Sequence, residues 1–557
     1  MCGARSQLWT RLLVSRFLED VLDADATQEL HLLRRRFIFA YVDKFASKFL
    51  LVCRKQYASI LLREFVPLLG SRVTVTLARW GGARLVPGEL RDELFTRMVS
   101  FLRERGTYEV ACEGADVVQA RHLAFLAQSG VGAADFLPRS CFRTDEQGER
   151  VPPEVTLAYP MASAKFHKQP MGWRYIACSA SYTLRALSVW LGRAFSGLLP
   201  VADSMWDARM REAKVYSRGS WVLRDSQGVP SMVRQMNNDI PVSRRAGVRL
   251  QTFDFAKMYT NIRLDVLKER MRHLFTQLFK FQRDGCRRHR FLRVSTKRDG
   301  VVWVSAREGD TAYAKVFDVG KLSAWFAFLV DNVYLTFTTD MVLRQRIGIP
   351  MGTNCAVFVA NLFCYSYEYD FISRLVAAGK FDLLRRFRFT RRFVDDLLSC
   401  DNPDFCRYLY VTSVDADGIA GIYPSFLRLS GEQDSLERVS FLDTYVAFDG
   451  RSWFTKTYDK REHPPWSRVD SLKYPDPSCY ISDRAKFGII TSRLHGFGRI
   501  CTRRADFVRR ARMFLREFRS RGYPVRRMWG YVLRFVRTVP LAFPVTSPHA
   551  LVKELTK

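Results

Sequence analysis

Residues 387–403, FRFTRRFVDDLLSCDNP, place two adjacent aspartates, Asp395 and Asp396, inside an otherwise apolar segment. The alternating residues on either side of the pair predict a β-hairpin with an acidic tip. Two neighbouring carboxylates in apolar surroundings repel each other unless a cation lies between them. An aspartate pair that only caps a turn is the ordinary alternative, so this segment alone is weak evidence for a metal site.

A third aspartate, Asp254, lies in the run VRLQTFDFAKMYTNI (248–262), whose β-branched and aromatic residues predict a strand. An unpaired charge in such a strand would cost several kcal/mol. Between this strand and the hairpin, the turn GIPMGTN (348–354) opens a long apolar helix. The three aspartates together suit Mg²⁺, which takes oxygen ligands and is shared with substrate phosphates. Two such ions about 4 Å apart can activate an attacking 3′-hydroxyl and neutralise a leaving pyrophosphate.

The chain has 557 residues and a formal net charge of +32, from 88 Lys and Arg against 56 Asp and Glu. Its length predicts three or four structural units, and 48% hydrophobic residues exclude global disorder. The positive charge favours nucleic acid as the partner, with an anionic membrane surface as the competitor. Twelve scattered cysteines without a C-x-x-C pair, no secretory signal and no long apolar run predict a soluble intracellular protein without a membrane partner.

The first 150 residues are predicted to be mostly helical, because Leu30, Leu33, Phe37 and Tyr41 recur at helical spacing. No catalytic constellation appears there, so this part is expected to be an accessory domain. The polar stretch TDEQGERVPPE (144–154) marks its boundary.

Beyond that boundary, periodicity predicts helices near 183–199, 205–216 and 263–281 and again from 321. The basic segment 282–310 is expected to be an irregular surface excursion, and short strands are expected beyond 440. Residues 481–557 hold 18 Lys and Arg against 4 Asp and Glu, a local net charge of 18 − 4 = +14, and are predicted to form a basic helical tail.

The order FDFAKMYTNI, GIPMGTN, FVDD resembles motifs A, B and C of a reverse transcriptase palm. Further segments are similar to the Penelope-like retroelements, a class related to telomerase reverse transcriptases: KFHKQPMGWRYIACSAS, WVLRDS, GIPMGTNCAVFVANLFCYSYEYDFI, IYP, SFLD and YDKRE. The resemblance covers about residues 156–540. Gly421-Ile422-Tyr423 is followed by Pro424 without a Y-I-G partner, so the chain resembles a member that lacks the GIY-YIG nuclease.

This resemblance implies an α+β right-hand polymerase. Its parts would be an N-terminal mostly helical domain (1–155), fingers (156–250), a palm with motifs A, B, C and the primer-grip region (251–480), and a basic helical thumb (481–557). The implied activity is RNA-directed DNA polymerisation, the extension of a 3′-hydroxyl by two-metal-ion nucleotidyl transfer. The implied partners are an RNA template, a DNA or RNA primer and dNTPs. Two Mg²⁺ ions, with Mn²⁺ as the alternative, and a nuclear location are also expected.

The resemblance also assigns roles to single residues. Asp254, Asp395 and Asp396 match the catalytic, metal-binding triad. Tyr259 stands where polymerases gate the sugar, and a bulky ring there predicts deoxynucleotide selection. The remaining nucleotide-binding candidates are Lys165, Lys168, Arg174, Phe255, Gly352 and Asn354. The sequence does not decide which lysine binds the triphosphate, nor whether Asn354 contacts the nucleotide or caps a helix.

Nucleic-acid contacts are expected from two segments. Lys460 and Arg461, in YDKRE, match the region near the primer. In the tail, Phe507, Ala511, Phe514 and Phe518 recur at helical spacing and predict a core-facing stripe. The remaining faces carry arginines that would hold a template–primer duplex by its phosphates, among them Arg509, Arg510 and Arg516.

Three other functions remain open at this point. An RNA-dependent RNA polymerase would need a residue that accepts the 2′-hydroxyl, and Tyr259 argues against it. A catalytically silent nucleic-acid-binding protein descended from a retroelement has no physical reason to keep three aspartates in apolar strands. A template-independent terminal nucleotidyltransferase would use the same palm.

Overall fold

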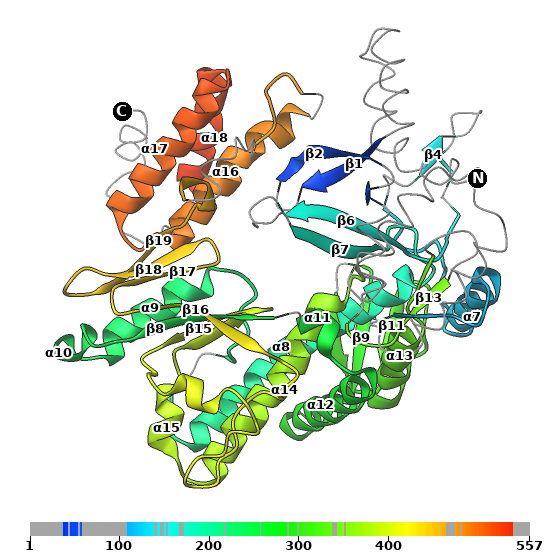
Figure 1. Ribbon diagram of the computed structural model, residues 1–557, viewed down its shortest axis with the longest axis horizontal. Helices are drawn as coiled ribbons and strands as arrows, with labels where there is room; N and C mark the ends of the chain where they lie inside the picture. The colour runs from blue at the N-terminus through cyan, green and yellow to red at the C-terminus, as the bar shows by residue number, and fades with distance from the viewer. Residues whose placement is uncertain are drawn as a thin grey trace. The chain divides into compact units, whose positions relative to one another are not determined.

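The computed structural model describes seventeen segments of the chain: residues 37–42, 45–53, 56–57, 108–138, 142–144, 150–151, 154–165, 172–216, 219–256, 258–286, 289–297, 300–306, 308–336, 342–349, 352–463, 474–479 and 482–538. They fall into two compact units (Figure 1). Unit 1 contains residues 1–205 and 257–366, and unit 2 contains residues 206–256 and 367–557.

The N-terminal part of unit 1 contains a four-stranded sheet in the order β2-β1-β6-β7. Its strands are β1 (Phe37–Val42), β2 (Phe45–Cys53), β6 (Tyr159–Lys165) and β7 (Gly172–Cys178). The helix expected through Phe37 and Tyr41 is therefore wrong, while Leu30 and Leu33 lie outside the described residues. FIFAYV is a short apolar run, in which periodicity does not separate a strand from a helix, and here antiparallel pairing with β2 decides.

Helices make up much of the remainder of unit 1. They are α7 (Ala115–Gln128), α11 (Met258–Asn261), α12 (Leu264–Gly285) and α13 (Val319–Asp331). Helix α12 confirms the amphipathic helix predicted over 263–281, and α13 confirms the one predicted from 321. Two further helices continue from unit 1 into unit 2: α8 (Arg185–Glu212) and α14 (Ala356–Ala377).

Helix α8 corrects the prediction of two separate helices near 183–199 and 205–216. The chain passes through Pro200 without a break, although proline removes one helical hydrogen bond. Leu198 and Val201 on either side of the proline are buried, so packing offsets that loss.

Small sheets complete unit 1. Strands β9 (Phe291–Ser295), β10 (Val301–Val304) and β11 (Ala314–Phe317) form an antiparallel sheet, so the irregular segment predicted over 282–310 is wrong in part. Leu292 and Val294 alternate with arginine and are fully buried, a period-2 signal that the high charge of the segment obscures. A second sheet has the order β12-β13-β3, from Tyr334–Thr336, Val342–Gln345 and Tyr108–Val110. β4 (Arg143–Thr144) pairs with β5 (Arg150–Val151).

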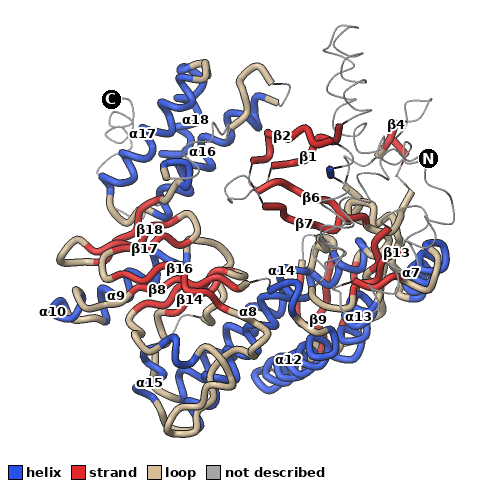
Figure 2. Tube along the Cα trace, viewed as in Figure 1, coloured by secondary structure: helices blue, strands red, loops and turns tan. Residues whose placement is uncertain are grey.

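Unit 2 is built on an antiparallel sheet in the order β14-β15-β8-β16 (Figure 2). The strands are β14 (Thr390–Phe393), β15 (Asp396–Cys400), β8 (Leu250–Phe255) and β16 (Leu429–Ser435). This confirms the predicted strand around Asp254 and the predicted hairpin. A second sheet contains β17 (Arg438–Phe441), β18 (Thr444–Phe448) and β19 (Trp453–Thr457), which confirms the strands expected beyond 440.

Short helices and a shared apolar core support these sheets. The helices are α9 (Gly228–Asp239), α10 (Val242–Arg245), α15 (Phe381–Arg386) and the 3-10 turns Phe405–Tyr408 and Lys460–Glu462. Residues from α9, β8, β14, β15 and β17–β19 pack into one buried cluster that includes Met236, Leu398 and Trp453.

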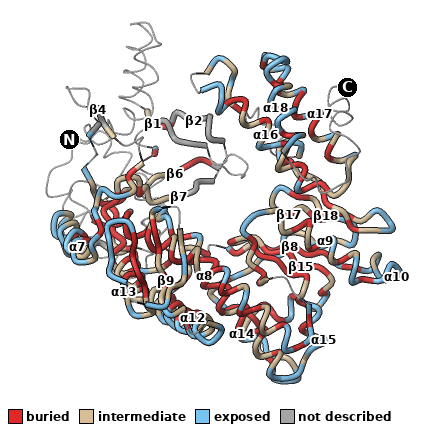
Figure 3. The backbone as a smooth tube through the Cα atoms, turned by 180° about the vertical axis from the view of Figure 1, so that it is seen from behind, coloured by how far each residue is buried: buried red, intermediate tan, exposed pale blue. Residues whose placement is uncertain are grey.

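The C-terminal part of unit 2 is helical, as predicted. It consists of α16 (Asp483–Ile500), α17 (Arg504–Ser520) and α18 (Val525–Thr538). The predicted stripe of Phe507, Ala511, Phe514 and Phe518 is confirmed, because all four residues are buried in the core of these helices. Figure 3 shows buried stretches along the three helices. Among the described residues, no helix combines the length and the apolarity that crossing a membrane requires.

Candidate active site

Strands β8 and β15 bring the predicted aspartates together. In the antiparallel register, Asp254 is the direct partner of Asp396, and the amide of Phe255 donates to the carbonyl oxygen of Asp395 at 3.1 Å. Directly opposite residues share a face of the sheet, with their Cβ atoms about 5 Å apart. Two carboxylates that are remote in the sequence are therefore neighbours, with Asp395 next to them in the turn of the hairpin.

The electrostatics of this site disfavour negative charge. Burial, followed by the charges of Asp395, Asp254 and Glu432, raises the pKa of Asp396 to about 6. Lys460 acts in the opposite direction, so the structure brings one of the predicted primer-contact residues into the field of the carboxylates. Like charges placed opposite each other destabilise a sheet, and a bound cation would remove that repulsion.

Glu432 is a member of the site that the sequence did not indicate. It lies on β16, which pairs with β8 on the side away from β15. Its segment, LSGEQDS, is polar and belongs to no motif, so only the sheet order shows that Glu432 adds a fourth carboxylate near Asp396.

The donor set suits Mg²⁺ in an open site. Within the described segments, no group of three or more His, Cys, Asp or Glu residues is placed so that it could hold a metal ion by itself. Mg²⁺ is commonly held by only one or two carboxylates together with waters and substrate phosphates. Adjacent carboxylates that repel each other therefore fit the ligand chemistry of Mg²⁺.

The tip of the hairpin is strained. Val394, between Phe393 of β14 and Asp395, has a φ of +57° and is 8% exposed. A β-branched residue rarely adopts the left-handed conformation, and such outliers occur where surrounding contacts hold them, often at functional sites. The backbone that carries the two aspartates is therefore held in a conformation that valine alone would not choose.

In unit 1, Tyr259 is joined to the glycine turn predicted as motif B. The amide of Ile349 donates to the carbonyl oxygen of Tyr259 at 2.7 Å. Gly348 has a φ of +101°, and a Cβ there would overlap the Tyr259 carbonyl oxygen. A side chain at Gly348 is thus excluded by both conformation and contact, and the turn fixes the backbone of the predicted sugar gate.

Gly352 makes a similar close approach to β7. It has a φ of +98°, and a Cβ there would overlap the carbonyl oxygen of Ala177. Ser179 donates a hydrogen bond to the Gly352 carbonyl oxygen. The need for glycine at this position thus follows from contact with the chain's own backbone, in addition to the predicted contact with a base pair.

The other predicted nucleotide-binding residues are also in unit 1, apart from Phe255, which is buried on β8. Lys165 ends β6, and Arg174 lies on the neighbouring β7, paired with Ser163. Lys168 lies outside the described residues. Asn354 is exposed just before α14, and its backbone amide donates to the Ser188 hydroxyl at 3.3 Å.

Arg461 and Arg510 are engaged within unit 2. Arg461 donates to Asp459 at 2.8 Å and to Glu517 of α17 at 2.9 Å. Arg510 pairs with Asp459 and, at 2.5 Å, with Glu462. The two arginines therefore join the YDKRE turn to α17, and their predicted contacts with nucleic acid stay a prediction.

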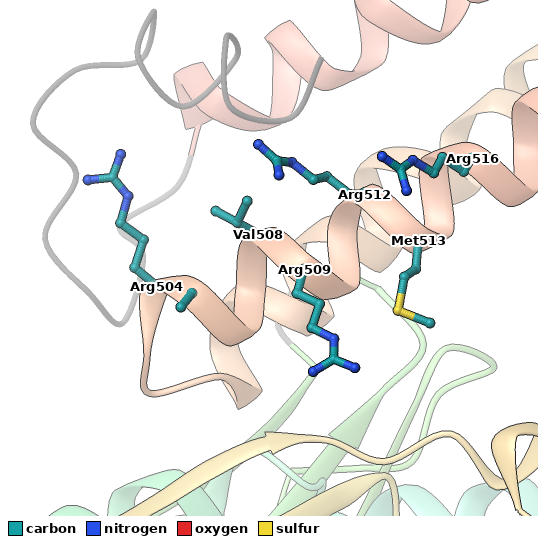
Figure 4. Close-up of a pocket in the computed structure, with 7 residues that line it drawn as sticks. Arg504, Val508, Arg509, Arg512, Met513 and Arg516 are labelled. Atoms are coloured by element: carbon teal, nitrogen blue, oxygen red, sulfur yellow. The ribbon is translucent and has the colours of Figure 1, made fainter. Parts of the chain in front are cut away.

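Arg509 and Arg516 lie on a different face of α17. Both are exposed and line a shallow pocket together with Arg504, Arg512, Val508 and Met513 (Figure 4). In Figure 4, Arg504, Arg512 and Arg516 extend to one side of the helix and Arg509 extends to the other. The four arginines give this surface a dense positive charge suited to phosphate.

The fold is similar to that of a solved telomerase. The chain is similar to telomerase from Candida albicans, solved in complex with a TWJ fragment of telomeric RNA, with a TM-score of 0.51 and 9% identity over 95% of this chain and 71% of that one. Similarity to apo telomerase from Candida tropicalis is lower, with a TM-score of 0.40, 11% identity and 99% and 79% of the two chains covered. For the BmCPV RNA-dependent RNA polymerase at its elongation state, the TM-score is 0.32, with 12% identity over 62% and 25% of the chains. No family model and no curated protein matches the sequence.

Proposed function

We propose that the protein is an RNA-directed DNA polymerase that extends a 3′-hydroxyl on an RNA template. The observation that carries this proposal is the direct pairing of Asp254 with Asp396 beside Asp395. Such a carboxylate group, in a chain with a telomerase-like fold, suits two-metal nucleotidyl transfer. We further propose fingers over 156–250, a palm over 251–480 and a thumb over 481–557, in an endonuclease-lacking relative of Penelope-like elements that acts in the nucleus.

In this proposal, Asp254 and Asp395 hold two Mg²⁺ ions and Asp396 assists them. The ions would activate the primer hydroxyl and neutralise the leaving pyrophosphate. The protein's own contribution is to hold the carboxylates on adjacent strands before the nucleotide arrives, so that little reorganisation is needed in the transition state.

Tyr259 is proposed to select deoxynucleotides by excluding a ribose 2′-hydroxyl. Its backbone is fixed by the bond from Ile349, so the glycine turn holds the main chain from which the ring projects. Tyr259→Ala should raise the use of ribonucleotides relative to deoxynucleotides by at least tenfold. An unchanged ratio of the two kcat/KM values would remove Tyr259 from this role.

The decisive experiment is primer extension on an annealed RNA template with dNTPs and Mg²⁺. Wild type is compared with Asp395→Asn, which removes a charge without changing volume, and with Asp434→Asn as a matched control. Asp434 lies on β16 of the same sheet but pairs with Arg249 at 2.6 Å and takes no part in the carboxylate group. Product from wild type and Asp434→Asn, but not from Asp395→Asn, would support the proposal.

Two further arms separate the alternatives. Product that persists when the template is omitted would indicate a terminal nucleotidyltransferase. No product from wild type, with salt-sensitive duplex binding intact, would indicate a silent nucleic-acid-binding protein.

A further inference from the structure

A buried charged group lies directly behind the strained hairpin. Arg392 of β14, Glu368 of α14 and Tyr423 of the IYP segment are all fully buried. Arg392 Nε donates to Glu368 Oε1 at 2.5 Å, and Nη2 donates to Oε2 at 3.3 Å. The Tyr423 hydroxyl donates to the same Oε1 at 2.7 Å. Glu368 thus receives hydrogen bonds from two residues that are distant from it in the sequence.

The guanidinium of Arg392 also reaches the tip of the hairpin. Its Nη1 donates to the carbonyl oxygen of Val394 at 3.0 Å. Val394 is the residue with a φ of +57°, and Asp395 and Asp396 follow it directly. A single planar side chain therefore binds a carboxylate on one side and the strained backbone on the other, which only the forked geometry of arginine allows.

The backbone of Arg392 is fixed independently of its side chain. Its amide donates to the carbonyl oxygen of Trp221 at 2.6 Å, and the amide of Leu223 donates to its carbonyl oxygen at 2.7 Å. These bonds come from the WVLRDS segment, which pairs with β14 at Val222. The backbone from which the Arg392 side chain extends therefore has a fixed position in the sheet.

The same group also contacts the strand that carries Asp254. The ring of Tyr423 packs edge-on against Phe255, with the ring centroids 5.0 Å apart. Phe255 follows Asp254 on β8. The Glu368–Arg392–Tyr423 group thus contacts both chain segments that carry the catalytic carboxylates.

We infer that Glu368, Arg392 and Tyr423 are positioning residues, which hold the Val394 carbonyl and thereby set the orientation of Asp395 and Asp396 for metal binding. This inference rests on the proposed polymerase function. A buried ion pair is costly to desolvate. When all its hydrogen bonds are satisfied, it holds the paired side chains in fixed positions. Here the Arg392 side chain holds Val394 in a positive-φ conformation that valine rarely adopts.

The test compares Arg392→Lys with Arg391→Lys. Lysine at 392 can still neutralise Glu368 but lacks the fork that spans Glu368 and Val394. Arg391 is the adjacent residue of β14, is also buried, and donates to the carbonyl oxygens of Thr390 and Arg388, at 2.7 and 3.1 Å. Adjacent strand residues face opposite sides of the sheet, so the control makes the same chemical change away from the hairpin tip.

Two measurements are made on each variant. The first is primer extension as a function of Mg²⁺ and dNTP concentration. Arg392→Lys should lower kcat by roughly 10- to 100-fold and raise the Mg²⁺ needed for half-maximal rate, with the dNTP KM and duplex Kd unchanged. The second is Mn²⁺ binding to the protein without nucleotide, followed by electron paramagnetic resonance, in which Arg392→Lys should weaken binding by roughly 10-fold.

Rescue provides a readout that a purely structural role would not give. Glycine adopts a positive φ freely, so Val394→Gly should recover part of the rate and of the Mn²⁺ affinity in the Arg392→Lys background. Tyr423→Phe removes the hydroxyl that donates to Glu368 at 2.7 Å and should show a smaller loss of the same kind.

The outcomes separate this inference from the proposed function. An active wild type in which Arg392→Lys behaves like Arg391→Lys would overturn the inference alone. An inactive wild type in which only Arg392→Lys weakens Mn²⁺ binding would overturn the polymerase proposal and leave the positioning role standing. Equal loss of duplex binding, dNTP affinity and rate in Arg392→Lys would show general disruption and would also overturn the inference.

Discussion

Two ion-pair networks in unit 2 differ chiefly in their access to solvent. The first is the Glu368–Arg392–Tyr423 group, whose charged side chains are 0% exposed. The second joins Asp459 and Glu517 to Arg461 and Arg510, with side-chain exposures of 5%, 25%, 22% and 13%. The first holds one backbone carbonyl at the candidate active site, and the second holds a whole helix against a turn.

The difference in exposure implies a different response to substitution and to salt. A sealed pair is barely screened and leaves a full charge uncompensated when one partner is lost. A partly exposed network is screened more strongly by salt, and its exposed charges can be hydrated after a substitution. The first network should therefore respond to substitution in an all-or-none manner, and the second gradually.

Glu368→Gln should have the largest effect on stability. It leaves the Arg392 guanidinium buried without a counter-charge, which should lower the free energy of unfolding by about 3 to 5 kcal/mol. Chemical denaturation measures this value. The double variant Glu368→Leu with Arg392→Met should recover at least half of the loss, because an apolar pair removes the buried charge altogether. A single-variant loss below about 1 kcal/mol would contradict the sealed character of the network.

His122 in unit 1 sharpens the comparison, because it is a buried titratable group kept neutral without a counter-ion. It is 0% exposed, and its Nδ1 lies 2.6 Å from the Thr183 hydroxyl. Burial, followed by the charge of Arg121, lowers the pKa of His122 to about 3 from its ordinary 6.5. Below about pH 6.5, His122 is therefore protonated in the unfolded chain but stays neutral in the folded protein. The free energy of unfolding falls as the pH decreases from about 6.5 towards 3.

At pH 5 this histidine should reduce the free energy of unfolding by about 2 kcal/mol relative to pH 7. Denaturation at the two pH values is compared between wild type and His122→Gln, which cannot titrate. The pH-dependent loss should be smaller in the variant by this amount. An equal loss in both proteins would show that His122 does not control it.

Asp459→Asn should have a moderate effect. Arg461 retains Glu517, and Arg510 retains Glu462, so the loss should be about 1 to 2 kcal/mol. Raising NaCl from 0.1 to 1 M should shrink this loss, because the screening length falls from about 10 to about 3 Å. The loss caused by Glu368→Gln should not change with salt. Equal salt dependence of the two losses would remove the distinction between the networks.

The sequence indicated the strands that carry the three aspartates better than the residues that support those strands. Alternation and the placement of Asp254, Asp395 and Asp396 were sufficient for the strand and the hairpin, because both signals are local. Glu368 lies in the helical run CYSYEYDF, where a glutamate looks like an ordinary exposed residue. Its pairing with Arg392 depends on how helix and sheet pack, which no local pattern contains.

The same limit explains the errors in the N-terminal and basic regions. FIFAYV (37–42) satisfied a helical spacing by chance, and its pairing with β2 decided the outcome. In 282–310, charged residues hid the buried alternation of Leu292 and Val294. The nucleic-acid contact expected of Arg510, as of Arg509 and Arg516, stays a prediction, and the structure adds that Arg510 pairs with Asp459.

This last contrast gives the smallest expected effect. Arg509 is exposed on the outer face of α17, while the Arg510 side chain is 13% exposed and paired with acids. Arg509→Ala should weaken duplex binding several-fold and lower the slope of log K against log salt by about 1, with no change in melting temperature. Arg510→Ala should do the reverse, lowering stability with little change in the salt slope. Titration of a labelled RNA–DNA duplex at several salt concentrations, beside thermal melts, measures both. Equal salt slopes for the two variants would show that Arg510 releases Asp459 and Glu462 to bind phosphate. The second network would then exchange partners, unlike the fully buried Glu368–Arg392–Tyr423 group.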